Sequence, residues 1–263
     1  MTTRQRRGLR GVALAVVLFC AACNRSGDTN YTAVRSYPHD VTAFTEGLLY
    51  EDGVLFESTG LYGRSQLRRE DLATGRVIAA VSLPANRFGE GLALLHGRLY
   101  QLTWKSGTGY LYDARNLARL DSFRFTGEGW GLTTDGQSLI MSNGSADLRY
   151  LDPATFATRR IVTVKDSGLT VNALNELEYV RGDLFANVYQ THFIVRIDPA
   201  TGEVLQWIDL TALVPSGDMG SAMNVLNGIA FDTATGDLLV TGKLWPRIYE
   251  IRVGPVRGQS GSK

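Results

Sequence analysis

Cysteine and histidine are scarce in this chain, and their placement excludes two common ways of stabilising a fold. The two cysteines, Cys20 and Cys23, both lie in the N-terminal apolar segment. No disulfide can therefore form within the rest of the chain, whatever the redox state of its compartment. The three histidines, His39, His96 and His192, lack the close spacing of zinc ligands. We expect a domain held together by apolar burial, without a zinc site.

An excess of charge and a membrane-spanning apolar run are also missing. Lys and Arg number 27 against 26 Asp and Glu, and no basic stripe stands out, which argues against nucleic acid as a partner. The apolar run Val12–Ala22 is too short for a spanning helix. It follows a cluster of arginines that includes Arg6 and Arg7. A charged start before a short apolar run is typical of a secretory signal.

The N-terminus therefore predicts export, and it sets the expected boundaries. We assign residues 1–23 to a signal peptide, 24–30 to a polar tether, 31–254 to one folded domain and 255–263 to a disordered tail. The end of the apolar run resembles a bacterial lipoprotein cleavage site with Cys23 as the lipidated residue, although Cys20 stands where Leu is usual. The expected location is the periplasm, with Cys23 as the single point of attachment if the signal is of the lipoprotein kind.

A short phrase that returns five times predicts the fold. In each copy a variable position is followed by a small or acidic residue and then by Leu or Ile. Successive copies begin roughly 40 to 50 residues apart, a spacing typical of a repeat architecture. They are FTEGLLY from Phe44, FGEGLAL from Phe88, EGWGLTT from Glu128, LNELEYV from Leu174 and LNGIAFD from Leu226.

Each repeat reads as four short strands, and five repeats predict an all-β fold, a five-bladed β-propeller. Short alternating apolar segments bounded by turn residues follow every phrase, and no stretch has a sustained helical period. Sheets of this kind bury their faces by stacking around a channel. The last repeat ends at Arg247–Val253, one strand short, while Tyr31–Tyr37 precedes the first phrase. We expect this N-terminal strand to complete the last blade and close the ring.

Equivalent positions of the blades converge at the mouth of the channel, where the sequence places polar and aromatic residues together. Singly, each has an ordinary explanation: aromatics at strand ends pack on neighbouring blades, and a lone Lys or Glu is solvated. Together they have the composition of a small-molecule site, a polar centre with apolar walls. The variable positions of the phrase are Glu46, Glu90, Trp130, Asn175 and Asn227, and the ends of the next apolar runs add Trp104, Tyr189 and Lys243.

Seven motifs, in order, make the chain similar to the glutaminyl-peptide cyclotransferases of the plant and bacterial type. The resemblance covers nearly the whole chain after residue 30. It implies a five-bladed propeller and an enzyme that converts the N-terminal glutamine of peptides or proteins into pyroglutamate, releasing ammonia, with no nucleic acid involved and as a monomer. The motifs are HDVTAFTEGL, RFGEGL, LTWK, EGWGLT, VNALNELEY, NVLNGIA and GKLWP, which span 39–246.

The resemblance also implies roles for single residues. The central acid of the family falls on Glu90, which can act as base and then as acid, and Lys243 matches a position suited to stabilising the oxyanion. Glu46 stands where plant members carry Gln, and Tyr189 where Trp is more usual. Asn175 matches a position that binds the substrate amide. The aromatic walls that hold the glutamine side chain bent fall on Phe44, Phe88, Trp104 and Trp130.

Two other functions stay open on the sequence alone. A calcium-dependent lactonase-like propeller hydrolase also aims Glu and Asn side chains at the channel mouth, a pattern that Glu46, Asn175 and Asn227 imitate. A non-enzymatic exported propeller would use the same aromatics to grip a ligand. The cyclotransferase scheme requires no cofactor and is compatible with a structural calcium ion in the channel. The long connection 209–227 reads as a mobile loop that the sequence does not place.

Overall fold

The fold is built from five four-stranded antiparallel sheets, which we number as blades 1 to 5. The computed structural model describes residues 30–256, so the predicted signal segment with Cys23, and nearly all of the tether and tail, lie outside the described residues. The strands are β2 (Thr45–Glu51), β3 (Val54–Thr59), β4 (Gln66–Asp71) and β5 (Arg76–Ser82) in blade 1; β6 (Gly89–Leu95), β7 (Arg98–Thr103), β8 (Thr108–Asp113) and β9 (Arg119–Arg124) in blade 2; β10 (Leu132–Thr134), β11 (Leu139–Met141), β12 (Asp147–Leu151) and β13 (Thr158–Thr163) in blade 3; β16 (Leu174–Val180), β17 (Asp183–Val188), β18 (Phe193–Ile197) and β19 (Val204–Asp209) in blade 4; β20 (Leu226–Phe231), β21 (Leu238–Gly242), β22 (Arg247–Val253) and β1 (Tyr31–Pro38) in blade 5.

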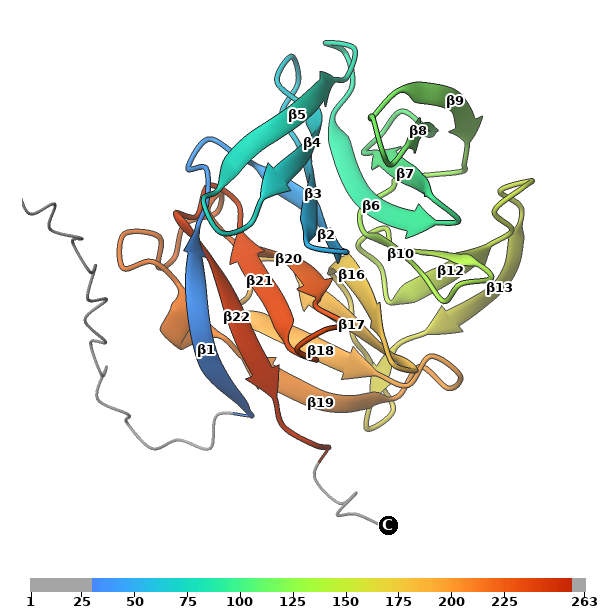
Figure 1. Ribbon diagram of the computed structural model, residues 1–263. Coiled ribbons are helices and arrows are strands. Elements are labelled where there is room, and N and C mark those ends of the chain that lie inside the picture. The colour runs from blue at the N-terminus through green and yellow to red at the C-terminus, as the bar shows by residue number, and fades with distance from the viewer. Residues whose placement is uncertain (1–29, 257–263) are drawn as a thin grey trace, which may run out of the picture.

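The blades are arranged around a centre, which confirms the predicted propeller. Strands β2, β6, β10, β16 and β20 lie innermost, and the last strand of each blade lies at the rim (Figure 1). In blade 5 the rim strand is β1, which pairs with β22 from Tyr31↔Val253 to Pro38↔Arg247. The N-terminal strand therefore closes the ring by backbone hydrogen bonds, as the sequence predicts.

The other regular elements lie in the connections between blades 3 and 4 and between blades 4 and 5. The first holds a short hairpin of β14 (Lys165–Asp166) and β15 (Leu169–Thr170), and the second begins with the 3₁₀ turn η1 (Thr211–Leu213). The second connection is fastened at its far end, because Lys243 N donates to Val225 O at 2.9 Å. No helix among residues 30–256 is long and apolar enough to cross a membrane.

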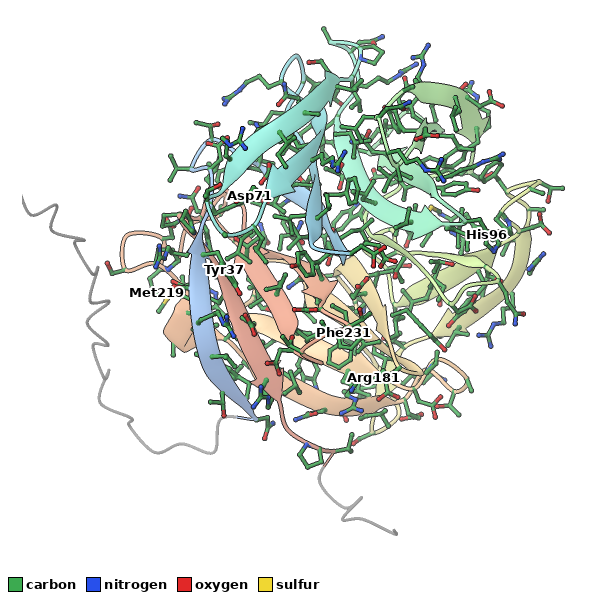
Figure 2. The ribbon with its side chains drawn as sticks, in the orientation of Figure 1. Tyr37, Asp71, His96, Arg181, Met219 and Phe231 are labelled. Carbon is green, nitrogen blue, oxygen red and sulfur yellow. The ribbon has the colours of Figure 1, made fainter. Side chains whose placement is uncertain are left out.

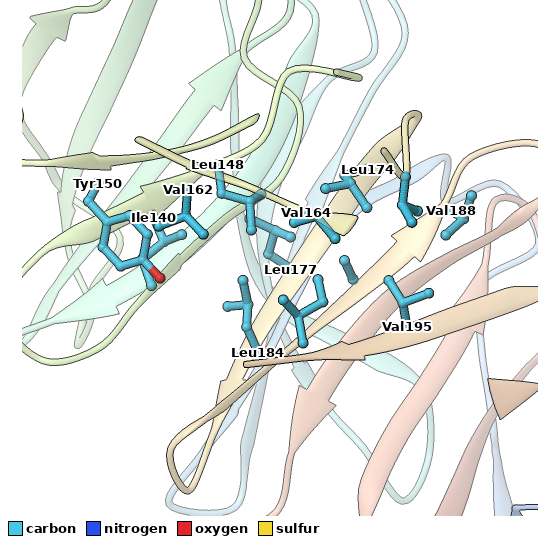
Figure 3. Packing of buried hydrophobic residues seen from close by; sticks show 13 residues of the cluster. Ile140, Leu148, Tyr150, Val162, Val164, Leu174, Leu177, Leu184, Val188 and Val195 are labelled. Atoms are coloured by element: carbon cyan, nitrogen blue, oxygen red, sulfur yellow. The ribbon is translucent and has the colours of Figure 1, made fainter. Parts of the chain in front are cut away.

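The apolar core is divided among the five interfaces between neighbouring blades. Each interface holds one cluster of buried side chains, as the alternation of apolar residues along short strands requires. The largest lies between blades 3 and 4, where Leu148 and Val162 meet Leu177 and Leu184 (Figure 3). Contacts at the periphery add to these clusters: the guanidinium of Arg181 in blade 4 lies 5.1 Å from the ring of Phe231 in blade 5 (Figure 2).

The inner strands approach so closely that four of the five copies of the phrase need glycine after the variable position. A Cβ on Gly91 would lie 2.4 Å from Leu132 N, and one on Gly131 would lie 2.0 Å from Asn175 O. Blade 4 carries Glu176 at this position. Its buried carboxyl accepts hydrogen bonds from the backbone of two other blades, from Ile229 N at 2.8 Å and Leu48 N at 3.3 Å. The channel centre is therefore filled by a side chain that ties three blades together.

The interface between blades 5 and 1, where the ring closes, differs from the others. Its apolar cluster is the smallest of the five. Beside it the buried His39 contacts Trp245 O through Nδ1 at 2.7 Å and the Glu57 carboxylate through Nε2 at 3.1 Å. Arg68 lies between the carboxylates of Asp40, at 2.9 Å, and Glu57, at 3.7 Å. A buried polar network thus supplements apolar packing at this interface.

Candidate active site

The candidate site residues stand on irregularities of the inner strands. The pairing of inner and second strands slips between Thr45 and Gly47, between Gly89 and Leu92, between Leu174 and Leu177, and between Leu226 and Ile229. A bulge leaves its residue unpaired and turns the side chain out of the sheet, and bulges are frequent beside active sites. The variable positions of blades 1, 2, 4 and 5, namely Glu46, Glu90, Asn175 and Asn227, all fall within these slips.

The backbone groups freed at the bulges are satisfied by side chains of the preceding blade. Ser58 Oγ donates to Glu90 O at 2.5 Å, and Ser142 Oγ donates to Asn175 O at 2.7 Å. Asn187 Oδ1 accepts from Gly228 N at 3.0 Å. Each of these side chains is fully buried. Because unpaired buried backbone groups are costly, these contacts fix the position of the bulges and with them the candidate site.

The centre of the site is two carboxyl groups and one ammonium group. Lys243 Nζ lies 2.7 Å from Glu46 Oε1, and the carboxyls of Glu46 and Glu90 are joined by a hydrogen bond. All three side chains are buried, with 5% exposure or less. Two carboxyls in contact cannot both ionise readily, so they share one proton near neutral pH.

The surroundings decide which carboxyl keeps that proton. Burial raises the pKa of Glu90 well above its usual range, and the neighbouring Glu46 charge adds to the rise. Burial also raises the pKa of Glu46, but the Lys243 ammonium opposes it. Glu90 is therefore the protonated member of the pair and Glu46 the ionised one. The contribution of the Glu46 charge to the raised pKa of Glu90 is a contact that the sequence did not reveal.

Aromatic rings lie around this centre in a circuit of two halves. Phe44 contacts Phe88 edge-on at a centroid distance of 6.1 Å, and Phe88 contacts Trp104 at 5.5 Å. On the other side Trp130 contacts Tyr189 at 5.4 Å. Lys243 Nζ closes one end of the circuit, 4.7 Å from the Phe44 centroid and 5.4 Å from that of Tyr189. The structure thus brings all the predicted aromatic residues together with the lysine.

At the end of the second apolar run of each repeat, blade 2 carries Trp104 and blade 4 carries Tyr189. Two glycines explain why this position is not aromatic in every blade. A Cβ on Gly60 would lie 2.4 Å from the Phe88 ring, and one on Gly144 would lie 2.8 Å from the Trp130 ring. Blades 1 and 3 therefore carry glycine at this position because a ring from another position occupies the space.

The two carboxamides play different parts. Asn227 is fully buried, and its Nδ2 donates to Thr45 O at 2.9 Å and to Glu46 Oε2 at 3.2 Å. It therefore fixes the Glu46 carboxylate by a hydrogen bond to the oxygen that Lys243 does not contact. Asn175 occupies the equivalent position of blade 4; its buried Oδ1, like that of Asn227, has no hydrogen-bond partner among residues 30–256, and its side chain does not contact Glu46 by a hydrogen bond there. An unpartnered buried acceptor at this level is suited to a substrate N–H.

Comparison with known proteins agrees with this geometry. The family model described as glutamine cyclotransferase matches residues 12–253. The chain belongs to the glutamine cyclotransferase family. It is 45% identical over 235 residues to a glutaminyl-peptide cyclotransferase of Arabidopsis thaliana, covering 87% of this chain and 73% of that protein. It also matches the crystal structure of the Myxococcus xanthus glutaminyl cyclase with a TM-score of 0.79 and 38% identity, over 85% of this chain and 96% of that chain.

In this member of the glutamine cyclotransferase family, the position of Lys243 is relevant to the alternative of a calcium-dependent lactonase-like hydrolase. The lysine ammonium already lies beside Glu46 Oε1, the oxygen that a calcium ion would need. Among the described residues, no three His, Cys, Asp or Glu side chains are grouped so as to hold a metal ion. A cation at the channel mouth would therefore have to compete with the Lys243 ammonium for the Glu46 carboxylate.

Sequence reasoning missed part of the site of this family member. Glu128 accepts hydrogen bonds from both Trp104 and Trp130, and Tyr62 packs edge-on against Phe88 at 5.5 Å. Glu128 stands in the EGWGLT motif, two residues before Trp130, so its position was visible but not its contacts. His39, by contrast, belongs to the blade 5–blade 1 interface, in agreement with the sequence analysis, which did not assign it to catalysis.

Proposed function

We infer that this chain is a glutaminyl-peptide cyclotransferase, an acyltransferase that converts the N-terminal glutamine of peptides or proteins into pyroglutamate and releases ammonia. Its similarity to the cyclotransferase of Arabidopsis thaliana extends over most of the chain. The observation that carries the assignment is the buried Glu90 carboxyl beside the Glu46–Lys243 ion pair, inside a circuit of aromatic rings. The residue roles that follow are our proposals.

The reaction is an internal acyl transfer. The free α-amine attacks the side-chain amide carbon, a C–N bond forms, and the bond to the amide nitrogen breaks. One proton must leave the attacking amine and one must reach the departing nitrogen, while negative charge develops on the amide oxygen. The side chain must also be held folded back on the α-amine, since proximity provides much of the rate.

Glu90 supplies the proton transfer in this proposal. Because its raised pKa keeps it protonated, it first donates its proton to the departing amide nitrogen. The carboxylate that remains accepts the proton from the attacking amine, and the enzyme ends in its starting state. This order, acid before base, is the reverse of the one expected from sequence. The reason is burial and, after it, the neighbouring Glu46 charge, both of which favour the neutral form of Glu90.

Lys243 provides positive charge for the developing oxyanion. Its ion pair with the buried Glu46 holds the ammonium at a fixed position among apolar side chains. A charge at a fixed position in such surroundings stabilises the transition state without reorganisation. The Glu46 carboxylate also offers an oxygen for the substrate's amino group.

The aromatic circuit and Asn175 hold the substrate. The rings of Phe44, Phe88, Trp104 and Trp130 form the apolar walls in this proposal, with Tyr189 contributing a smaller ring and a hydroxyl. The free Oδ1 of Asn175 accepts a hydrogen bond from the glutamine amide. Together they favour the folded conformer that the reaction needs.

We further propose that the enzyme works without a metal cofactor, as an exported monomer. No step of the scheme requires a Lewis acid, because Glu90 and Lys243 provide the proton and the positive charge. The arginine-rich, apolar N-terminus supports export to the periplasm, with lipid attachment at Cys23 as the variant to test. In blade 5 the rim strand β1 covers the edge of β22 by backbone pairing, so that edge needs no second chain.

The test is mass spectrometry of a peptide with N-terminal glutamine, incubated with the protein from Asn30 onward, with and without a chelator. We expect chelator-resistant loss of ammonia. Glu90→Gln removes the transferable proton and should lower kcat by about 10²- to 10⁴-fold. Glu178→Gln is the matched control, because Glu178 is also a buried carboxyl with a raised pKa but bonds to Thr133 and Phe231.

Two results would count against the proposal. A wild-type protein that leaves every such peptide unchanged would contradict the assigned activity. A Glu90→Gln protein that is folded and fully active would contradict the role of Glu90 but leave the activity standing.

A further inference from the structure

One carboxylate joins the two halves of the aromatic circuit. Glu128 Oε2 accepts a hydrogen bond from Trp104 Nε1 at 2.8 Å and another from Trp130 Nε1 at 3.0 Å. Trp104 follows β7 in blade 2, whereas Trp130 precedes β10 in blade 3. The contact therefore bridges two blades. It lies in the part of the circuit that ring-to-ring contacts leave open, since Lys243 connects Phe44 and Tyr189.

Hydrogen bonds also fix the main chain around Glu128. Arg149, on β12, donates through Nη1 to Thr126 O at 2.7 Å and through Nη2 to Glu128 O at 3.4 Å. The next residue, Gly129, donates its N–H to Trp104 O at 2.9 Å. The main chain around Glu128 is thus fastened to two blades before its side chain makes any contact. A group positioned in this way can orient the side chains it binds.

The Glu128 carboxylate is also partly exposed to solvent. The Glu128 side chain is 40% exposed, and Lys105 Nζ lies 3.8 Å from its Oε1. The same ammonium lies 4.0 Å from the Trp104 ring centroid, so Lys105 covers one face of that indole. Trp104 is therefore constrained by its N–H, by Lys105 and by Phe88.

We propose that Glu128 is a positioning residue of this cyclotransferase, whose carboxylate holds the indoles of Trp104 and Trp130 in the orientation that receives the substrate's glutamine side chain; the inference rests on the proposed function. A tryptophan side chain rotates about two bonds, and each indole carries one N–H that needs an acceptor when half-buried. Glu128 satisfies both donors and fixes both rings before substrate arrives. Its removal transfers the cost of ordering two rings to the binding step.

We therefore expect substitutions of Glu128 to change the affinity for the substrate and not the rate of the chemical step. Glu128→Ala removes the acceptor, and we expect KM for a glutamine peptide to rise about ten-fold while kcat stays within about two-fold. Glu128→Gln keeps an oxygen of the same reach and should restore KM to near the wild-type value. Burial, Glu46 and, to a smaller degree, Glu128 raise the pKa of Glu90, so each variant is measured at its own pH optimum.

The chain offers a matched control outside the site. Trp207, on β19, donates its Nε1 to Asp166 Oδ2 at 2.9 Å, the same type of contact at the blade 3–blade 4 connection. Asp166→Ala should leave KM and kcat unchanged. Near-ultraviolet circular dichroism of the free proteins reports tryptophan order independently of turnover. It should change in Glu128→Ala and remain close to wild type in Glu128→Gln.

Several outcomes would overturn the proposal. These are an unchanged KM in folded Glu128→Ala, a fall in kcat without a rise in KM, an equal rise in KM in Asp166→Ala, or a failure of Glu128→Gln to restore KM. Melting temperatures establish folding, and Glu128→Ser replaces Glu128→Ala if the latter does not fold. An inactive wild-type protein would contradict the proposed function, and the dichroism of the variants would still show whether Glu128 orders the two indoles.

Discussion

The site residues depart from the family pattern at Glu46 and at Tyr189, and the structure gives the first departure a chemical meaning. The plant members that this chain resembles carry Gln where Glu46 stands. Here the extra carboxylate forms a buried ion pair with Lys243 and a hydrogen bond with Glu90. It therefore acts on two groups at once, because it pairs with the lysine ammonium and adds to the rise that burial causes in the pKa of Glu90.

Replacing Glu46 by Gln should shift the pH dependence of the reaction. The substitution removes a negative neighbour of Glu90 and leaves the Lys243 charge uncompensated, and both changes lower the pKa of Glu90. Because the protonated form of Glu90 starts the reaction, activity is lost as pH rises through this pKa. The basic limb of the kcat profile should therefore move to lower pH by about one unit. Steady-state rates across the pH range measure this, and an unmoved basic limb in active Glu46→Gln would contradict the proton-sharing pair.

At the same scale, the sequence identified the chemistry of single positions better than their contacts. Glu90, Lys243 and the aromatics at equivalent positions could be named because such positions of a repeat converge, whereas Phe44 and Phe88 were named from the family resemblance. The bond from one Glu128 oxygen to two indoles could not, since it depends on side-chain reach between two blades. The same holds for Glu57, an apparently ordinary strand residue that is buried against His39 and Thr45.

Among the elements, β1 has a role that its position in the chain does not suggest. It is the first strand of the described chain, yet it forms the rim of the last blade. Its Tyr31 packs into the cluster between blades 4 and 5, and its Tyr37 hydroxyl donates to Glu250 Oε2 at 2.6 Å. Without β1 the edge of β22 would be exposed along its length, and an exposed edge favours aggregation.

A chain that begins at His39 should therefore fail to fold cooperatively. The chain that begins at Asn30 retains β1 and should give a single thermal transition. The shorter chain lacks the strand that pairs with Arg247–Val253, so we expect no cooperative transition and a tendency to associate. Circular dichroism melting and size-exclusion chromatography compare the two. A native-like transition in the shorter chain would show that ring closure does not depend on β1.

The inner strands were predicted as strands, but their bulges were not. A bulge adds one residue to one of two paired strands, and strand-forming patterns do not reveal which residue lacks a partner. The slips at Glu46, Glu90, Asn175 and Asn227 became visible from the pairing alone. They explain how four candidate side chains leave the sheet at the same end of the channel.

For the molecule as a whole, the distribution of buried carboxyls matters more than its net charge. Burial raises the pKa of Glu178 to about 8. Burial and the nearby Glu57 charge raise that of Glu70 to about 8 as well. His39 changes in the same direction: burial opposes protonation, but Glu57 outweighs it and raises the pKa of the imidazole. In each case the folded protein binds a proton more tightly than the unfolded chain does.

Stability should consequently fall as pH rises from about 4.5 to 8. Over this interval the unfolded chain has lost protons that Glu70 and Glu178 retain in the folded state, so the free energy of unfolding decreases. The stabilisation from protonated His39 is also lost as pH rises through its raised pKa. Burial raises the pKa of Glu57, but His39 outweighs burial and lowers this pKa below its usual value. The stabilisation from ionised Glu57 is therefore lost only at more acidic pH.

We expect the melting temperature to be highest near pH 5 and to fall by roughly 5 °C or more towards pH 8. Glu178→Gln replaces the carboxyl by a neutral amide and should flatten this decline. Glu203→Gln, at an exposed position, should leave it unchanged. Calorimetry at a series of pH values makes the comparison, and a melting temperature that rises across this interval would refute the linkage.

The sequence by itself determined the number of blades, the strand that closes the ring and the side chains that meet at its centre. These follow from a repeat, because a repeated pattern of strands and turns places equivalent residues at equivalent points. Only the tertiary structure decided which carboxyl keeps the proton, how Glu128 joins Trp104 to Trp130 and why blades 5 and 1 meet through a polar network. Those features depend on distances between residues from different blades, which no local pattern contains.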